Sequence, residues 1–308
     1  MDRLMPMLPA GLPGDAKWPN IVYLRLLAPQ FLSGYTRLIY LDADVLCMKA
    51  DPKVWGLALP SGLAMVSDYA TLDRAPHDLK GMPRRAWLDS IGVKSERYAN
   101  SGMLLIDPAV FAAHNFARLL PDYFARHPAA VRYDQDFLNS VFDGVWTELG
   151  PRFNYQATIL EAGYTKAIDP VFVHFCRRQK PWWGQEDNWF SPTDPLYTEA
   201  YDRVLSNAGF DPQTYRRPNY VKFERRIKYA FYRWLGTRGI KVAREGRTIA
   251  DWQRRSDFLY EFLNQGLRSG RFADESRTAI PRTAETPWFD GRFVKTWGNP
   301  LHKASSAG

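Results

Sequence analysis

The sequence has few cysteines and no long apolar run. Only Cys47 and Cys176 are cysteines among its 308 residues, and two widely spaced thiols do not form a disulfide framework. We therefore expect a reducing, cytoplasmic setting. No stretch reaches the roughly 18 apolar residues that a membrane span needs. Residues 1–20 also lack such a run, so we expect neither a signal peptide nor a span there.

Most of the chain has no excess of positive or negative charge. The total is +8, yet residues 216–247 alone carry eleven Lys or Arg and two Glu, a net charge of +9. The rest of the chain is close to neutral, so we do not expect its body to bind nucleic acid. Hydrophobic residues make up 45% of the chain, which is enough for a full core.

Short apolar runs alternate with helical patterns in the first part of the chain, which indicates an α/β sheet. We expect strands at 38–41, 63–67, 98–107 and 171–175, and helices at 23–32, 108–126 and 134–142. The first strand is apolar on both faces, which predicts that both faces are covered. The residues before it supply no further strand, so we expect an unusual strand order or a chain that lacks an upstream half.

The pattern changes near residue 185. Helical patterns follow at 197–207, 220–235 and 249–267, and residues 269–308 show no clear periodicity. We therefore expect a catalytic domain over residues 1–190, a helical extension over 191–268 and an irregular tail over 269–308.

Two carboxylates follow the first predicted strand, in Asp42-Ala43-Asp44. Acids at the end of a buried strand can face the crevice where α/β proteins bind ligands, and hard divalent cations prefer carboxylate oxygens. Solvated turn carboxylates are the alternative. His174 ends another apolar run and is either a third ligand or a core residue. Lys180 follows it in a basic loop that can pair with phosphates or lie on the surface.

Two further polar groups interrupt regular patterns. Asp134-Gln135-Asp136 opens a helix, where acids either cap the helix or reach sugar hydroxyls. Asn100-Ser101-Gly102 lies inside an apolar strand. Glycine weakens a strand and often marks close backbone approach to a ligand.

Six segments in a fixed order carry a family resemblance. They are Tyr23-Leu24-Arg25, Leu41-Asp42-Ala43-Asp44-Val45-Leu46, the segment 98–106, the segment 134–139, Arg152-Phe153-Asn154-Tyr155 and the segment 174–182. The series resembles glycosyltransferase family 8, which includes glycogenin and bacterial lipopolysaccharide galactosyl- and glucosyltransferases. The resemblance covers residues 23–183, about half of the chain.

The resemblance implies a GT-A fold, which is a Rossmann-like α/β fold. It also implies transfer of a hexose, glucose or galactose, from a UDP-sugar to a glycan or lipid-linked saccharide, with retention of anomeric configuration. The implied cofactor is Mn²⁺ or Mg²⁺, held by Asp42, Asp44 and His174. The implied donor contacts are Arg25, Asp42, Ala43, Asn100, Ser101, Asp134, Gln135, Arg177 and Lys180. The implied catalytic residues are Asp134, Gln135 and Asp136, with Gln135 or Asp136 nearest the reacting carbon.

The sequence departs from the family pattern in two places. Family members normally carry an upstream βαβ segment that holds uracil and ribose, and no such pattern precedes Asp42. We therefore expect an N-terminally incomplete GT-A fold with a helical C-terminal extension. Arg177 stands where the family often has glycine, and it either reinforces phosphate binding or crowds the site.

The basic segment contains an amphipathic pattern. In residues 220–235, Phe223, Ile227, Ala230, Phe231 and Trp234 fall on one helical face, and Lys222, Arg226 and Arg233 on another. Such a helix either binds an anionic membrane surface or packs on the catalytic domain. The first interpretation predicts a cytoplasmic enzyme at the inner face of the membrane.

Two other functions compete with the transferase hypothesis. A chain without a complete donor-binding half would act as a non-catalytic binding protein. A nucleic-acid binder would stack bases on Tyr229, Tyr232 or Trp234. Whether Mn²⁺ and UDP raise the melting temperature distinguishes the transferase from the non-catalytic binding protein. Salt-sensitive binding of a random oligonucleotide would support the nucleic-acid binder.

Overall fold

The computed structural model describes residues 4–16, 19–72, 81–156, 159, 164–176, 180–183, 195–217, 223–240 and 243–282. The chain forms two compact units. Unit 1 comprises Met1–Ala43, Asp51–Asn154 and Gly270–Ser276, and unit 2 comprises Asp44–Ala50, Tyr155–Ser269 and Arg277–Gly308. The division into three regions at residues 190 and 268 stays a prediction.

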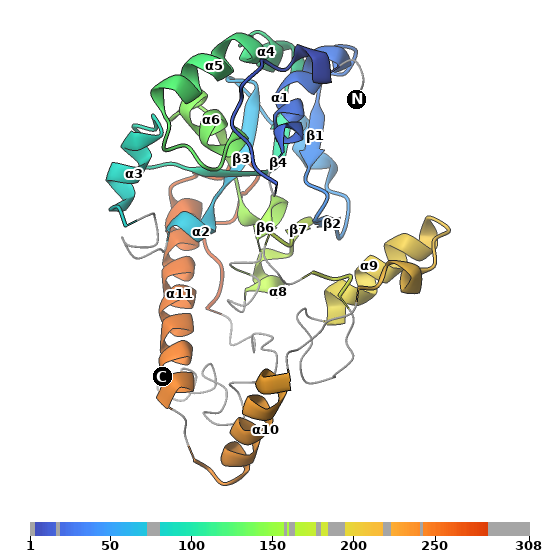
Figure 1. The fold of residues 1–308 in the computed structure, drawn as a ribbon, viewed down its shortest axis with the longest axis vertical. Helices are drawn as coiled ribbons and strands as arrows, with labels where there is room; N and C mark the ends of the chain where they lie inside the picture. The colour runs from blue at the N-terminus through green and yellow to red at the C-terminus, as the bar shows by residue number, and fades with distance from the viewer. Residues whose placement is uncertain are drawn as a thin grey trace. The chain divides into compact units, whose positions relative to one another are not determined.

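Unit 1 is built on a four-stranded mixed sheet in the order β1-β4-β3-β5 (Figure 1). Its strands are β1 (Leu38–Leu41), β3 (Leu63–Ser67), β4 (Ala99–Ile106) and β5 (Thr147–Leu149). Strand β4 runs antiparallel to β1 and β3, and β5 runs parallel to β3. The predicted α/β class is therefore confirmed, with a sheet of mixed rather than uniform direction.

Helices of unit 1 pack with this sheet around one core. The helices are α1 (Leu24–Leu27), α2 (Tyr69–Leu72), α3 (Arg84–Ser90), α4 (Pro108–Ala112), α5 (Phe116–Arg126) and α6 (Asp134–Val141). Short 3₁₀ turns cover Met5–Met7, Asn20–Tyr23, Ala28–Leu32, Pro52–Gly56 and Pro151–Phe153. Leu88 of α3, Leu104 of β4, Leu120 of α5 and Phe137 of α6 are fully buried in this core. The core thus fixes the start of α6 against strand β4.

The prediction that β1 is buried on both faces is wrong. All four of its residues are only half-buried, whereas all five residues of β3 are buried. In the described part of the chain β1 pairs only with β4 and lies at the end of the strand order. Apolar composition alone does not tell a central strand from an edge strand, because both bury at least one face.

Two predicted helices are divided in the structure. The segment 23–32 consists of α1 between two 3₁₀ turns. Pro29 lacks the backbone N–H that would continue the α-helical hydrogen bonds, and a 3₁₀ turn follows α1 although Ala28 keeps helical φ and ψ. The segment 108–126 divides into α4 and α5, because Asn115 adopts a left-handed conformation with φ of 48°.

Unit 2 contains a three-stranded sheet in the order β2-β7-β6. The strands are β2 (Val45–Cys47), β6 (Tyr155–Gln156) and β7 (Phe172–His174). The helices are α8 (Thr165–Ile168), α9 (Pro195–Asn207), α10 (Phe223–Thr237) and α11 (Ala243–Arg268), with a 3₁₀ turn at Pro212–Tyr215. The three predicted C-terminal helices are confirmed, although residues 220–222 lie outside the described residues.

The predicted tail is described only as far as residue 282, and residues 269–282 contain neither helix nor strand. None of the helices in the described part of the chain is both long and apolar enough to cross a membrane.

Candidate active site

Acidic residues follow two strands of the unit 1 sheet at the same end of β4. Asp42 follows β1 and donates its backbone N–H to the carbonyl of Gly102 at 2.9 Å. Asp68 follows β3 and donates its backbone N–H to the carbonyl of Tyr98 at 2.9 Å. These bonds continue the antiparallel ladders past the strand ends and fix both acids beside the Asn100-Ser101-Gly102 segment.

That segment forms a bulge in β4. Ala64 pairs with Leu105 but Val66 pairs with Asn100, so β4 contains extra residues opposite β3. A bulge leaves backbone groups outside the ladder and re-aims side chains. The side chain of Asn100 accepts bonds from Gly102 N at 3.0 Å and from Asn154 Nδ2 at 2.9 Å. The predicted interruption of this strand is thus a polar bulge next to Asp42 and Asp68.

Arg25 of α1 connects this bulge to two carboxylates. Its Nη1 lies 3.0 Å from Asp42 Oδ1 and donates to the Ser101 carbonyl at 3.0 Å. Its Nε lies 3.3 Å from Asp134 Oδ2. The side chain is only 8% exposed, so the guanidinium bridges the two acids in a place shielded from water. Three predicted donor-binding residues, Arg25, Asp42 and Ser101, are therefore in contact.

The Asp134 carboxylate begins α6 and is almost fully buried. Burial raises its pKa, the charge of Arg25 opposes that rise, and the pKa reaches about 6. Asp134 Oδ2 accepts no hydrogen bond from the described residues. A buried carboxylate with a raised pKa is a feature of functional sites, although structural ion pairs also produce it.

Gln135 is held by three side chains and a backbone amide. Its Oε1 accepts from Ser101 N at 3.2 Å and from Asn100 Nδ2 at 3.4 Å. Its Nε2 donates to Asp68 Oδ2 at 2.8 Å and to the Tyr98 hydroxyl at 3.1 Å. The predicted sugar-binding residues Asn100 and Gln135 therefore meet, and Asp68 joins them.

Asp136 lies beneath this layer. Its side chain accepts from the Tyr98 hydroxyl at 2.5 Å and from Arg132 N at 2.9 Å, and the residue has no exposed surface. The bond to Arg132 N spans Tyr133, whose φ of 44° is unusual for a bulky residue. Asp136 thus anchors the backbone that starts α6, and the predicted catalytic trio divides into two side chains near the bulge and one beneath it.

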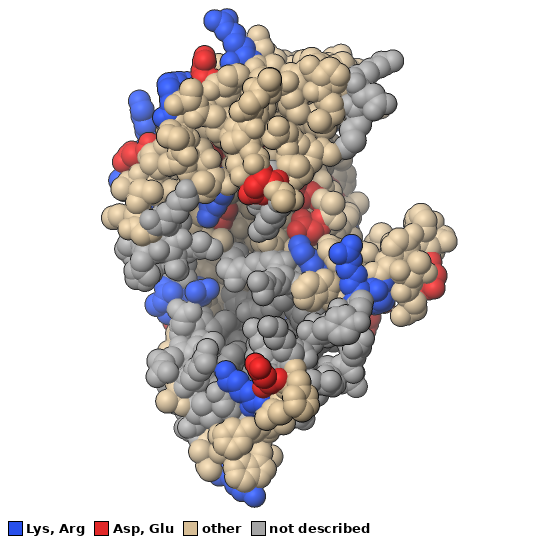
Figure 2. Space-filling view, viewed as in Figure 1, with Lys and Arg blue, Asp and Glu red and all other residues tan. Residues whose placement is uncertain are grey.

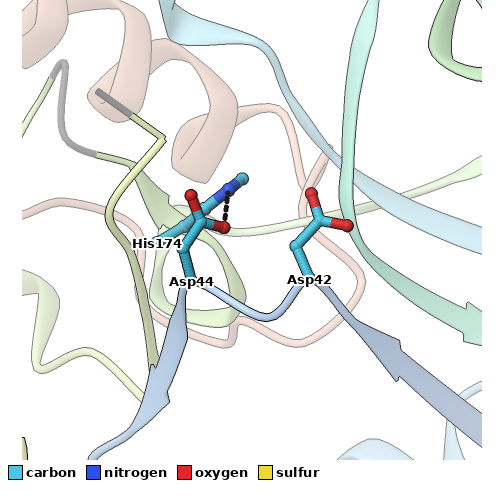
Figure 3. Close-up of side chains that lie close together, drawn as sticks. All are labelled: Asp42, Asp44 and His174. Atoms are coloured by element: carbon cyan, nitrogen blue, oxygen red, sulfur yellow. Dashed lines mark ion pairs between the residues drawn. The ribbon is translucent and has the colours of Figure 1, made fainter. Parts of the chain in front are cut away.

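In unit 2, Asp44 is bound by two potentially cationic side chains. His174 Nε2 lies 3.2 Å from Asp44 Oδ1, and Lys180 Nζ lies 2.5 Å from Asp44 Oδ2. The pairing of β2 with β7 places Val45 opposite His174, which brings the histidine next to Asp44. Figure 3 shows the Asp44–His174 pair as a dashed line. Burial raises the pKa of Asp44, but hydrogen bonds and charge interactions with His174 and Lys180 outweigh it and lower the pKa to about 2.

Asp42 and Asp44 are separated only by Ala43, which carries no polar side chain. Two residue steps along the chain span at most about 7 Å, so the covalent link alone keeps the Arg25-bound acid close to the His174-bound acid. Arg177, the remaining predicted donor contact, lies outside the described residues.

Sequence reasoning missed Asp68, Tyr98 and Asn139 as parts of this network. Asn139 donates to the Ala99 carbonyl at 2.9 Å and accepts from Ala99 N at 2.6 Å, which ties α6 to β4. Asp68 had the same signal as Asp42, since it directly follows an apolar strand. Tyr98 and Asn139 lie within the family segments 98–106 and 134–139, but no role was predicted for them, because their bonds join elements far apart in the sequence.

Comparison with known sequences identifies the family. Residues 10–185 match the sequence profile described as Glycosyl transferase family 8, which is more than half of the chain. The chain belongs to this family. Membership confirms the resemblance carried by the six segments, and with it the GT-A class of α/β fold.

Family 8 relatives include proteins of several organisms. General stress protein A of Bacillus subtilis is 29% identical over 60% of this chain and 64% of its own length. Lipopolysaccharide glucosyltransferase WaaO of Escherichia coli is 26% identical over 62% of this chain and 56% of its own length. Lipopolysaccharide 1,3-galactosyltransferase of Salmonella typhimurium is 27% identical over 56% of this chain and 53% of its own length. The matched part of this chain thus spans less than two thirds of the length of each relative.

Among solved structures, the chain is similar to galactosyltransferase LgtC in complex with donor and acceptor sugar analogs. The two are 23% identical, the match covers 63% of this chain and 71% of that chain, and the TM-score is 0.47.

Proposed function

We propose that the protein is a retaining glycosyltransferase that moves glucose or galactose from a UDP-sugar to a glycan or lipid-linked saccharide acceptor. Family membership supports the reaction type. Relatives named as lipopolysaccharide glucosyl- and galactosyltransferases support a hexose donor and a saccharide acceptor. We place the enzyme in the cytoplasm, at the inner face of the membrane, where such acceptors are built.

A divalent metal is the cofactor of this proposal. Asp42 and Asp44 each offer a carboxylate oxygen and His174 offers an imidazole nitrogen, and this donor set suits Mn²⁺ and also accepts Mg²⁺. When bound, the cation supplies charge that stabilises the diphosphate leaving group. Lys180 supports the assignment, because its ammonium already lies against Asp44 as a cation would.

The observation that carries the proposal is the bridging of Asp42 and Asp134 by one buried arginine beside the β4 bulge. The single positive charge of Arg25 is shared between both acids where a sugar diphosphate would bring further negative charge. We assign donor contacts to Arg25, Asp42, Ala43, Asn100, Ser101, Asp134, Gln135, Arg177 and Lys180. Asp134 and Gln135 are the substrate-contacting members of the catalytic trio, and the fully buried Asp136 positions them.

Release of UDP from UDP-glucose and UDP-galactose tests the proposal. We expect the purified protein to release UDP from at least one donor in the presence of Mn²⁺, and EDTA to stop the release. Asp44→Asn should reduce the rate by about a hundredfold, because a cation ligand is lost. Asp89→Asn is the matched control, since the Asp89 side chain is 61% exposed and pairs only with Arg85 among the described residues. Release that is independent of metal, or equal in both variants, would contradict the proposal.

A further inference from the structure

The segment Arg152-Phe153-Asn154-Tyr155 is the family segment to which no role has been assigned. Its asparagine belongs to unit 1 and is fully buried, with 0% of its surface exposed. The side-chain Nδ2 of Asn154 donates to Asn100 Oδ1 at 2.9 Å. Asn154 thus contacts a proposed donor-binding residue although it has no surface of its own to offer a ligand.

The residues before Asn154 hold it in position. Arg152 Nη1 lies 2.5 Å from Asp51 Oδ2, and the two side chains are largely buried. Phe153 is also buried, and the Arg152 guanidinium lies over its ring with Cζ 5.5 Å from the ring centroid. The Asn154 backbone N–H donates to the Pro151 carbonyl at 3.2 Å. Asn154 therefore extends its amide from a backbone that is fixed on its N-terminal side.

The orientation of the Asn100 amide is set by two donors. An amide side chain can turn over about its last torsion, which exchanges its oxygen and its NH₂ group in nearly the same space. Asn100 Oδ1 accepts from Asn154 Nδ2 and, at 3.0 Å, from Gly102 N. Because both partners donate, they hold the oxygen on their side. The NH₂ group of Asn100 therefore faces Gln135 Oε1, at 3.4 Å.

Gln135 continues the same order of donors and acceptors. Its Oε1 also accepts from Ser101 N at 3.2 Å, and its Nε2 donates to Asp68 Oδ2 at 2.8 Å. A backbone N–H only donates and an ionised carboxylate only accepts, so these two partners fix the Gln135 amide as well. The three amides therefore form one directed chain of hydrogen bonds, which begins at Asn154 and ends on Asp68.

We propose that Asn154 is a positioning residue of the donor site, which acts on the donor sugar through Asn100. Asn100 is half-buried, so it can touch a ligand while Asn154 holds its oxygen in place. In this orientation one N–H of Asn100 bonds to Gln135 and the other is offered to a hydroxyl oxygen of the sugar. The inference rests on the proposed function, because it needs Asn100 to contact the sugar of a UDP-sugar.

The amide chain differs from the neighbouring Arg25 bridge in the part of the donor that it affects. Arg25 meets Asp42 and Asp134 as a charge, and charge acts on the diphosphate, which UDP and a UDP-sugar share. The amides are neutral, and a hydrogen bond acts only at contact distance. Figure 2 likewise shows mainly uncharged side chains on the drawn face of unit 1, with charged groups in separate places. Loss of Asn154 should therefore weaken binding of the sugar and spare binding of UDP.

Titration calorimetry in Mn²⁺ with UDP, UDP-glucose and UDP-galactose measures this difference on the full chain. Asn154→Ala should weaken binding of the preferred UDP-sugar about tenfold, because the Asn100 amide loses one of the two donors that orient it. Its affinity for UDP should change by less than about twofold. Asn154→Asp should weaken binding of the UDP-sugar further, by about a hundredfold, because a carboxylate places an acceptor against Asn100 Oδ1.

The matched control is Asn264→Ala, a substitution of another buried asparagine. Asn264 is 1% exposed, belongs to unit 2, and bonds through its amide to the Tyr260 carbonyl and to Ile280 N. It should leave the ratio of UDP-sugar affinity to UDP affinity unchanged. Melting temperatures show which variants fold, and Asn154→Ser, which keeps a hydroxyl in the buried site, replaces Asn154→Ala if the alanine variant does not.

A double variant tests whether Asn154 acts through Asn100. In an Asn100→Ala background, Asn154→Ala should cause no further loss of UDP-sugar affinity, because the residue that it positions is gone. A further loss as large as in the native background would overturn the inference, and so would equal weakening of UDP and UDP-sugar by Asn154→Ala alone. A native protein that binds neither UDP-sugar would overturn the proposed function together with the inference.

Discussion

At the scale of single residues, Lys180 forms an ion pair with Asp44, which we propose as a ligand of the metal. Its ammonium contacts Asp44 Oδ2 at 2.5 Å and also donates to the Phe175 carbonyl. Replacing Lys180 by Met should tighten binding of Mn²⁺ alone a few-fold, because a competing cation is removed from Asp44. The same change should weaken UDP binding in Mn²⁺ by about tenfold, because a phosphate partner is lost. Titration calorimetry measures both.

The control is Lys166→Met, which removes an exposed lysine of α8 in the same unit. It should leave both affinities unchanged. Parallel losses of Mn²⁺ and UDP affinity in Lys180→Met would show that Lys180 is a structural partner of Asp44 and not a phosphate contact.

Tyr98 connects Gln135, which contacts the β4 bulge, to Asp136, which binds the backbone at the start of α6. Its hydroxyl donates to Asp136 and accepts from Gln135, and the side chain is fully buried. Tyr98→Phe should lower the free energy of unfolding by about 2 kcal/mol, since a buried carboxylate loses a donor. Tyr123→Phe removes a single bond to a carbonyl and should cost only about 1 kcal/mol. Urea unfolding compares them, and equal losses would contradict a special role for Tyr98.

Asp274 makes unit 1 sensitive to pH. Burial raises the pKa of its carboxyl from 3.8 to about 6, against the bond from Gly150 N. The folded state therefore holds a proton that the unfolded state releases, so stability present below pH 3.8 is lost as the pH rises through 6. The loss should be about 3 kcal/mol. Asp274→Asn keeps an acceptor for Gly150 N but cannot titrate, so it should remove most of this pH-dependent loss of stability.

Urea unfolding at about pH 4 and about pH 8 measures this difference for both proteins. The native protein should lose more stability between the two conditions than the variant does. An identical pH dependence would show that Asp274 titrates normally in the folded chain.

At the scale of elements, the break between α4 and α5 rests on Asn115. Its φ of 48° and ψ of 59° are left-handed, a conformation that Asn and Gly adopt readily and Ala does not. Asn115→Ala should lower the free energy of unfolding by about 1 kcal/mol, while Asn115→Gly should change it by only a few tenths. Denaturant unfolding measures the stability of both variants. Equal stabilities would show that the left-handed conformation of Asn115 does not determine the break between α4 and α5.

Strands and helices were predictable where composition is strongly biased. The runs at 63–67 and 98–107 became β3 and β4, and the start of α6 at Asp134 was placed correctly, because apolar periodicity and first-turn acids are local signals. The helix break and the edge position of β1 were not predictable. Both depend on backbone geometry and on strand partners that no local pattern encodes.

The same limit applies to the candidate site. Arg25, Asp42, Asn100 and Gln135 were found through the family segments, and the structure joins them in one network of contacts. The roles of Asp68 and Tyr98 emerge only from the fold, because their partners on α6 lie more than thirty residues away in sequence. Buried polar side chains need hydrogen-bond partners. Because tertiary structure brings those partners together, the local sequence does not reveal them.

At the scale of the whole molecule, the proposed cofactor ligands come from distant parts of the sequence. Asp42 and Asp44 are separated only by Ala43, and His174 lies 130 residues after Asp44. A metal and a nucleotide that bind these ligands together should stabilise the folded chain more than either alone, because each supplies contacts that the other completes.

Thermal unfolding with Mn²⁺, UDP, both, and both plus EDTA tests this claim most directly. We predict that the combination raises the melting temperature by about 5 °C at saturating concentrations, more than the two separate shifts together. EDTA should reverse the shift, and Asp44→Asn should not show it. A UDP shift that is equally large without Mn²⁺, or no shift under any condition, would contradict a metal-dependent UDP-sugar transferase.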